Sequence, residues 1–178
     1  MKTWALAAAL AVTAPVAIEA SAAPQANLVE AAAATERFDR LLAAAETAGL
    51  TATLAGEGPY TVFAPVDAAF DTVPYEIYRS LLQPANRDIL AQLLSYHVVP
   101  GRYTANDLAG RQAFLTTAQG QRLLVDGVSS GAILVNEIDT VTYNVREMAK
   151  AIPVSGSGID IRAANGVIIP IDRVLLPQ

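Results

Sequence analysis

Residues 93–101 read LLSYHVVPG, and the chain changes its character within this stretch. Upstream, apolar residues recur at helical spacing from Ile89 to Leu94, and His97 lies at the end of the same face. This spacing predicts a helix that begins at Asn86. Downstream, apart from one expected helical turn, the pattern favours strands. The stretch therefore separates a part of the chain rich in helices from a part rich in strands.

The helical part carries recognisable helix boundaries. Asn27 with Glu30 three residues later predicts a capped helix, and Gly49 stands where a second helix should end. Asp67 is expected to cap a further helical piece. The strands expected in the second part are residues 113–117 and 121–125, which form a hairpin, followed by 131–136 and 166–176. Helices followed by strands, without regular alternation, indicate an α+β fold.

Length and composition limit the classes of function. The 178 residues contain no cysteine, one histidine and a formal net charge of −5, and one domain is the default at this length. Thiolate metal sites, cysteine nucleophiles and centres with several histidines are excluded. Nucleic acid is not an expected partner, because non-specific binding to it needs an excess of lysine and arginine.

The first two dozen residues have the pattern of a secretory signal. Lys2 gives a positive start, an apolar run continues to Ile18, and small residues precede Ala23. This predicts a signal peptide at residues 1–22 with cleavage near Ala22 and Ala23, followed by a mature domain at 23–178. The mature protein is then secreted or periplasmic. No later stretch is long and apolar enough to predict a transmembrane segment.

We find no motif for catalysis, metal or cofactor. Asp67 and Asp71 are four residues apart, as a pair of acid and base would be, but helix caps and solvated faces give the same spacing. Residues 155–158 read SGSG, which lacks the frame of a nucleophile elbow. We therefore predict no catalytic residue and a protein that is not an enzyme.

The remaining acidic groups fit no known metal motif. Asp126, Glu137 and Asp139 offer oxygen ligands, yet their spacing matches no calcium-binding loop. No metal site and no cofactor are therefore predicted.

His97 admits two interpretations. The favoured one is a mostly buried imidazole that hydrogen-bonds neighbouring turns, and the other is a ligand-contacting or pH-sensing residue. As a catalytic residue it is weak, because no serine and aspartate frame accompanies it.

Three segments together resemble the fasciclin-like domain family. They are TVFAPVDAAF at residues 61–70, LLSYHVVPG at 93–101 and NGVIIPIDRVLLP at 165–177. Their order and spacing also fit, so the resemblance covers about residues 27–177. It implies a single domain of about seven strands in a wedge or sandwich, with several helices packed on one side.

The resemblance also implies roles for particular residues. It pairs Thr61 with His97 as a structural clasp, and it gives Asp88 and Ile89, before the Tyr96-His97 pair, as candidate binding residues together with that pair. Alternatively, Asp88 and Ile89 are a surface aspartate beside a core isoleucine.

The sequence departs from the family pattern in two places. Ile169 and Pro170 stand where the family usually has histidine and valine, so the strand is expected to lie at an edge or to carry a bulge at Pro170. The chain also carries extra residues at about 137–158, an insertion in which an individual specialisation is expected.

Three functions are consistent with the sequence. The leading one is non-enzymatic cell adhesion or cell-surface and matrix interaction, with a surface macromolecule or self-association as the partner. The alternative is a carrier of an apolar small molecule such as a carotenoid. A hydrolase that uses Asp67 and His97 is the third and the least favoured.

Overall fold

A computed structural model describes residues 26–128, 133–138, 145–151 and 160–176 of the chain. The predicted signal peptide at 1–22 lies outside these residues. So does most of the predicted insertion, of which residues 137–138 and 145–151 are described as parts of one hairpin and a following bridge.

All but one of the described helices lie between Leu28 and Tyr96. The helices are α1 (Leu28–Ala33), α2 (Asp39–Ala48), α3 (Thr51–Ala55), the 3-10 helix η1 (Asp67–Thr72), α4 (Tyr75–Leu81), the 3-10 turn η2 (Pro84–Asn86), α5 (Arg87–Tyr96) and α6 (Ala105–Leu108). Within the described residues, no helix has both the length and the apolar character needed to cross a bilayer.

The strands of the described residues form two sheets of four. They are β1 (Tyr60–Pro65), β2 (Val98–Pro100), β3 (Gln112–Thr116), β4 (Arg122–Asp126), β5 (Leu134–Ile138), β6 (Val145–Lys150), β7 (Ile161–Ala163) and β8 (Gly166–Ile171). Sheet A has the order β2-β1-β8-β7, and sheet B has the order β3-β4-β5-β6. The strands β1 and β8 run parallel through six residue pairs and form the centre of sheet A.

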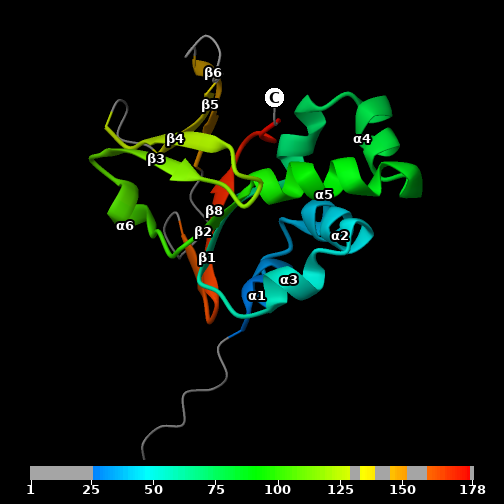
Figure 1. Cartoon of the computed structure of the whole chain (residues 1–178), viewed down its shortest axis with the longest axis horizontal. Coiled ribbons are helices and arrows are strands. Elements are labelled where there is room, and N and C mark those ends of the chain that lie inside the picture. The colour runs from blue at the N-terminus through cyan, green and yellow to red at the C-terminus, as the bar shows by residue number, and fades with distance from the viewer. Residues whose placement is uncertain (1–25, 129–132, 139–144, 152–159, 177–178) are drawn as a thin grey trace, which may run out of the picture.

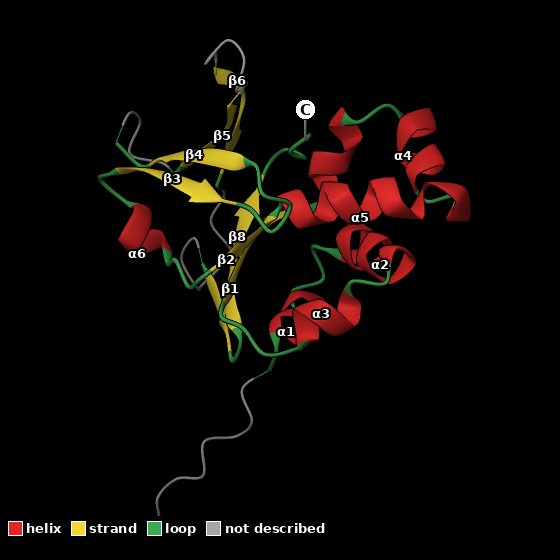
Figure 2. Cartoon of the chain, viewed as in Figure 1, coloured by secondary structure: helices red, strands yellow, loops and turns green. Residues whose placement is uncertain are grey.

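The elements are arranged in layers. Helices α1 to α5 lie together on one side of sheet A, and sheet B lies beyond its other face, as Figure 1 and Figure 2 show. The strands β3 and β4 of sheet B run across the direction of β1 and β8 in the same view. The α+β fold, with packed sheets and helices on one side, confirms the expectation from the sequence.

Alternation along the central strands explains the layers. Val62 and Ile168 belong to the core shared with the helices, whereas Phe63 and Ile169 belong to the core between the two sheets. Because successive side chains of a strand point to opposite faces, β1 and β8 contribute to both cores and are buried on both sides. A nearly continuous apolar run is the consequence.

The helix boundaries follow local chemistry, with one correction. Asn27 and Glu30 form the expected capping box, and Gly49 ends α2 with φ of 76°. Asp67, however, does not cap its own helix. Its Oδ1 accepts a hydrogen bond of 2.9 Å from the N–H of Arg40, so it caps the start of α2 instead. A free donor in a helix's first turn is satisfied equally well by a distant side chain.

Pro170 lies in an interior strand, not at an outer edge as the sequence suggested. The register between β1 and β8 continues through it without a bulge, pairing Pro170 with Ala64. The last pair of β7 with β8 joins Ile161 to Ile168, so Pro170 lies beyond the end of β7. The missing N–H of Pro170 therefore removes no hydrogen bond between β7 and β8.

The close contact at the start of β8 generates a prediction. A Cβ atom at Gly166 would collide with the backbone carbonyl oxygen of Tyr60 on β1. We predict that Gly166→Ala lowers the free energy of unfolding by about 1–3 kcal/mol, because backbone atoms of the central strands must move. Chemical denaturation of both proteins measures the difference. A change below about 0.5 kcal/mol would contradict this packing.

Candidate functional site

The side chain of His97 joins the end of α5 to the last described segment of the chain. His97 is 1% exposed. Its Nε2 accepts a hydrogen bond of 2.9 Å from the N–H of Leu175, and its Nδ1 lies 2.8 Å from the carbonyl oxygen of Leu93. Because Nε2 accepts, the ring is neutral with its proton on Nδ1, which donates to Leu93. Both ring nitrogens are thus used within the protein.

Burial controls the protonation of this ring. Loss of hydration lowers the pKa of His97 from 6.5 to about 4, although the bond to the Leu93 carbonyl acts in the opposite direction. Protonation would also turn Nε2 from an acceptor into a donor that faces another donor, the Leu175 N–H. The ring is therefore neutral at neutral pH.

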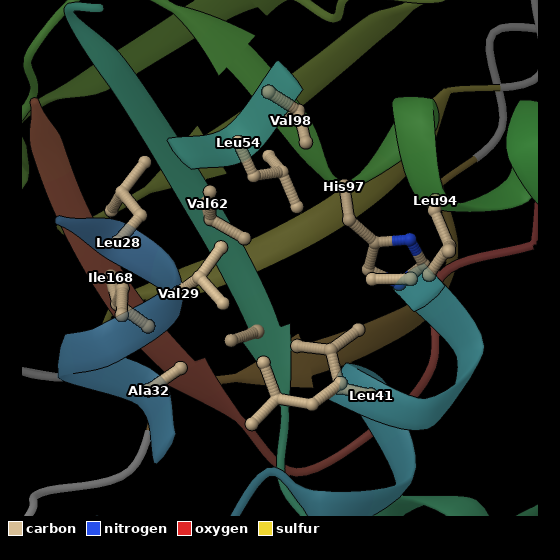
Figure 3. A pocket seen from close by; sticks show the side chains of 13 residues that line it. Leu28, Val29, Ala32, Leu41, Leu54, Val62, Leu94, His97, Val98 and Ile168 are labelled. Atoms are coloured by element: carbon tan, nitrogen blue, oxygen red, sulfur yellow. The ribbon is translucent and has the colours of Figure 1, made fainter. Parts of the chain in front are cut away.

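Two small apolar cavities adjoin His97. One has a volume of about 40 Å³ and lies between the helices and sheet A, as Figure 3 shows. The other has a volume of about 20 Å³ and is lined by residues of α2, α4, α5 and the closing segment. In Figure 3 the ring lies among aliphatic side chains, which include Leu41 and Leu94. This apolar environment is the cause of the lowered pKa.

Thr61 forms a separate link from the one expected. Its buried hydroxyl donates to the carbonyl oxygen of Gly101 at 2.8 Å and accepts from the N–H of Tyr103 at 2.8 Å. The side chains of Thr61 and His97 are not bonded to each other, since each has other partners. The first and second sequence blocks still meet near His97, where its backbone carbonyl accepts a 2.9 Å hydrogen bond from Phe63.

The four candidate binding residues divide into two groups. Tyr96 is buried at 1% exposure, as is His97, and their rings lie edge to face with centroids 6.5 Å apart. A partner that docks on the folded surface does not reach these two rings. Asp88 and Ile89, in the first turn of α5, are both exposed, with Ile89 at 56%. The interpretation of Ile89 as a core residue is therefore wrong.

The carboxylates considered for catalysis have structural partners. Asp67 caps α2, and Asp71 forms an exposed ion pair of 3.0 Å with Arg40. Neither carboxylate is hydrogen-bonded to His97, whose ring nitrogens bind backbone groups.

The acidic groups weighed for calcium are only partly described. Asp126 accepts hydrogen bonds from the Gln112 side chain at 2.9 Å and from the Val128 N–H at 2.8 Å. Of the other two, the side chain of Glu137 and all of Asp139 lie outside the described residues. In the part of the chain that the structure describes, no three acidic or histidine side chains are grouped as a metal site requires.

Sequence reasoning missed the partner of His97 in the closing segment. The bond uses the backbone N–H of Leu175, and a backbone group leaves no trace in residue type. The only available signal was the joint presence of the second and third sequence blocks.

Comparisons with known proteins agree on one family. The model of the fasciclin domain matches residues 36–177. The chain belongs to the fasciclin domain family. This confirms the resemblance carried by the three sequence blocks.

Relatives occur in bacteria and animals. The Synechocystis protein sll1483 is 37% identical over 151 residues, which cover 85% of this chain and 73% of that protein. The transforming growth factor-beta-induced protein ig-h3 of Sus scrofa is 35% identical over 154 residues, covering 86% of this chain and 20% of the pig protein.

A solved structure shares the fold. It is a fasciclin domain pair from the insect cell adhesion molecule fasciclin I, with a TM-score of 0.69 and 16% identity, over 86% of this chain and 52% of that one.

The buried histidine generates a pH prediction. The unfolded chain takes up the proton near pH 6.5 and the folded protein near pH 4, so the unfolded state holds more protons between these values. The contribution of His97 to the free energy of unfolding therefore falls by a total of about 3 kcal/mol as the pH drops from 6.5 to about 4. Below that pH the contribution falls no further.

This prediction is tested by denaturation at several pH values. We expect His97→Gln to be less stable than the wild type at pH 7.5, with a difference that shrinks toward pH 4 because glutamine does not titrate. Unfolding is followed by circular dichroism, since the only tryptophan is Trp4 in the predicted signal peptide. A difference that stays constant with pH would show that the ring does not titrate as described.

The Thr61 hydroxyl generates a second prediction. Thr61→Val keeps the shape of the side chain but leaves the Gly101 carbonyl and the Tyr103 N–H without their partner. We expect a loss of about 1–3 kcal/mol in the free energy of unfolding. Thr61→Ser, which keeps the hydroxyl, serves as the control and should lose less. A loss in Thr61→Val that is no larger than the loss in Thr61→Ser would contradict the role given to the hydroxyl.

Proposed function

We propose that this protein is a secreted or periplasmic, non-enzymatic interaction domain. On this proposal it binds a cell-surface or matrix macromolecule through the exposed start of α5. The observation that carries the proposal is the joint exposure of Asp88 and Ile89 on one helical turn. A carboxylate beside a half-exposed branched apolar side chain offers both a charge and an anchor to a protein partner.

Membership of the fasciclin domain family supports an adhesion role. One solved relative of the fold comes from an insect cell adhesion molecule. Secretion through the predicted signal peptide would bring the chain to such a partner. The acidic net charge of −5 favours a partner with basic groups near the Asp88 contact.

The state of His97 supports a non-enzymatic role. A general base must present a nitrogen to the substrate, whereas both nitrogens of His97 are bonded to backbone groups inside the protein. A hydrolase that used Asp67 and His97 would have to break the cap of α2 and the link to Leu175. The hydrogen bonds of the ring to Leu93 and Leu175 explain the buried histidine without catalysis.

The cavities favour interaction over carriage of a carotenoid. The two apolar cavities beside His97 have volumes of about 40 and 20 Å³, whereas pockets for drug-sized ligands measure about 300–1,000 Å³. A carrier that used these two cavities would have to separate the helices from sheet A before such a ligand could enter. Carriage beside His97 therefore needs a second conformation, and surface binding needs none.

A binding assay with a matched control tests the proposal. We predict that the double variant Asp88→Ala, Ile89→Ala binds at least tenfold more weakly to intact cells of the producing organism or to their isolated envelope polymers. The control is Glu76→Ala, Ile77→Ala, a second acidic and isoleucine pair in the first turns of α4 with both residues exposed. This control should bind within about twofold of the wild type.

Asp88 and Glu76 each lie in the first turn of a helix, where a carboxylate is favoured, so each double variant removes a favourable charge from its helix. Circular dichroism therefore checks that both variants are folded. The proposal fails if the wild type does not bind at micromolar concentration. It also fails if the two double variants lose binding equally.

A further inference from the structure

The two sheets have four outer edges, and three of them are protected. The edges are β2 and β7 in sheet A and β3 and β6 in sheet B. An edge strand presents unpaired backbone groups, which proteins usually shield with proline, charge, short length or a covering segment. The protection of each edge can be compared directly.

Three edges carry such protection. Strand β2 has three residues and ends with Pro100. Strand β7 also has three residues, and Arg102 donates to the carbonyl oxygens of Ala163 and Ala164 at its end, at 3.1 and 3.0 Å. Strand β6 has three charged residues in its six, and its end is closed by reciprocal hydrogen bonds between Lys150 and Asp172.

Among the residues that the structure describes, strand β3 has no such protection. Its five residues read QAFLT, without charge or proline. The side chain of Phe114, at the centre of the strand, is 57% exposed, and those of Gln112 and Thr116 are exposed beside it. An exposed aromatic residue in the middle of an uncharged edge strand favours pairing with a strand of another molecule.

The hydrogen bonds between β3 and β4 determine which backbone groups of β3 face away from β4. The Arg111 carbonyl accepts from the N–H of Gly127, and the N–H of Thr117 donates to the Gln121 carbonyl. In an antiparallel ladder the bonded residues alternate, so odd-numbered positions face β4 and even-numbered positions face away. The N–H and C=O groups of residues 112, 114 and 116 therefore point out of sheet B, and they have no hydrogen-bond partner among the described residues.

The length of this open edge is limited at both ends. At one end the N–H of Ala118, the next outward group, donates to the carbonyl oxygen of Val98 on β2. At the other end the chain turns away at Gly110, where φ is 74°. The open edge is thus confined to residues 112–116, with Phe114 at its midpoint.

We propose that β3 is a self-association edge that pairs antiparallel with β3 of a second copy, about a twofold axis through Phe114. A two-fold interface must be complementary to itself, and this strand meets that requirement. Phe114 lies opposite the second copy's Phe114, and Gln112 lies opposite the second copy's Thr116. No like charges face each other, and three outward residues of each copy supply donors and acceptors for the new ladder.

The outer face of the hairpin fits the same register. Leu124 on β4 is the direct neighbour of Phe114 and is partly exposed, so pairing would align an apolar row of Leu124, Phe114 and the same two residues of the second copy. The guanidinium of Arg122 lies 4.7 Å from the centroid of the Phe114 ring and helps to hold it over the sheet. In the adjacent row the order across the paired sheets would be Arg122, Thr116, the second copy's Gln112 and the second copy's Asp126. The two ends of this row then carry opposite charges.

This inference concerns a different surface from α5, and it does not depend on what Asp88 and Ile89 bind. The absence of cysteine from the chain makes a direct test clean, because any introduced cysteine is the only one. Residues opposite each other in a hydrogen-bonded antiparallel pair have Cα atoms about 5.5 Å apart, which a disulfide can span.

The test measures disulfide formation under mild oxidation with single-cysteine variants. Phe114→Cys should cross-link to itself at least tenfold faster than Val128→Cys, a control whose native side chain is also 57% exposed. Gln112→Cys and Thr116→Cys should each cross-link slowly alone, whereas a mixture of the two should form the mixed dimer. A rate for Phe114→Cys equal to that of the control would overturn the proposal, as would rapid self-linking of Gln112→Cys.

A second measurement avoids covalent chemistry. In sedimentation equilibrium the weight-average mass of the wild type should rise toward that of a dimer with concentration. Phe114→Glu and Phe114→Lys should each remain monomeric, because position 114 faces its own copy, and their mixture should recover the dimer. A wild type that stays monomeric up to millimolar concentration would overturn the proposal, and the edge would then be open only to a strand from another protein.

Discussion

The interaction on which the structure depends is the buried imidazole of His97, held between two backbone groups from distant parts of the chain. Leu93 is one helical turn before it, and Leu175 is 78 residues after it. The ring thereby connects the end of α5, where the helical part of the chain finishes, with the segment that follows β8. Because the site is apolar, this link exists only while the ring is neutral. The chain has one histidine, and the fold uses it as a connector between its layers.

The central strands β1 and β8 separate the two hydrophobic cores of the molecule. These parallel strands have apolar side chains on both faces, so one face receives the helices and the other receives sheet B. The interior side chains are therefore used for packing, and a partner is bound by residues at the surface. The first turn of α5 and the edge of β3 are two such peripheral features, and they carry the two proposals made above.

Much of the fold could be predicted from sequence because its signals are local. The capping box at Asn27, the helix end at Gly49 and the hairpin after residue 113 each depend on neighbouring residues. The structure differs from the expectation where a side chain serves a distant element. Asp67 has the sequence pattern of a cap for its own helix, yet it caps α2, and Thr61 binds Gly101 and Tyr103 instead of His97. The order of the strands, which leaves β3 at an edge, is also invisible in a single sequence.

His97 is a neutral connector with its proton on Nδ1. Because the chain has a single histidine, a long-range ¹H–¹⁵N correlation spectrum contains one imidazole and needs no assignment. We predict a neutral ring protonated on Nδ1 at pH 7, which does not titrate until the pH approaches 4. A ring that titrates near its ordinary pKa of 6.5, or that carries its proton on Nε2 at neutral pH, would contradict the account.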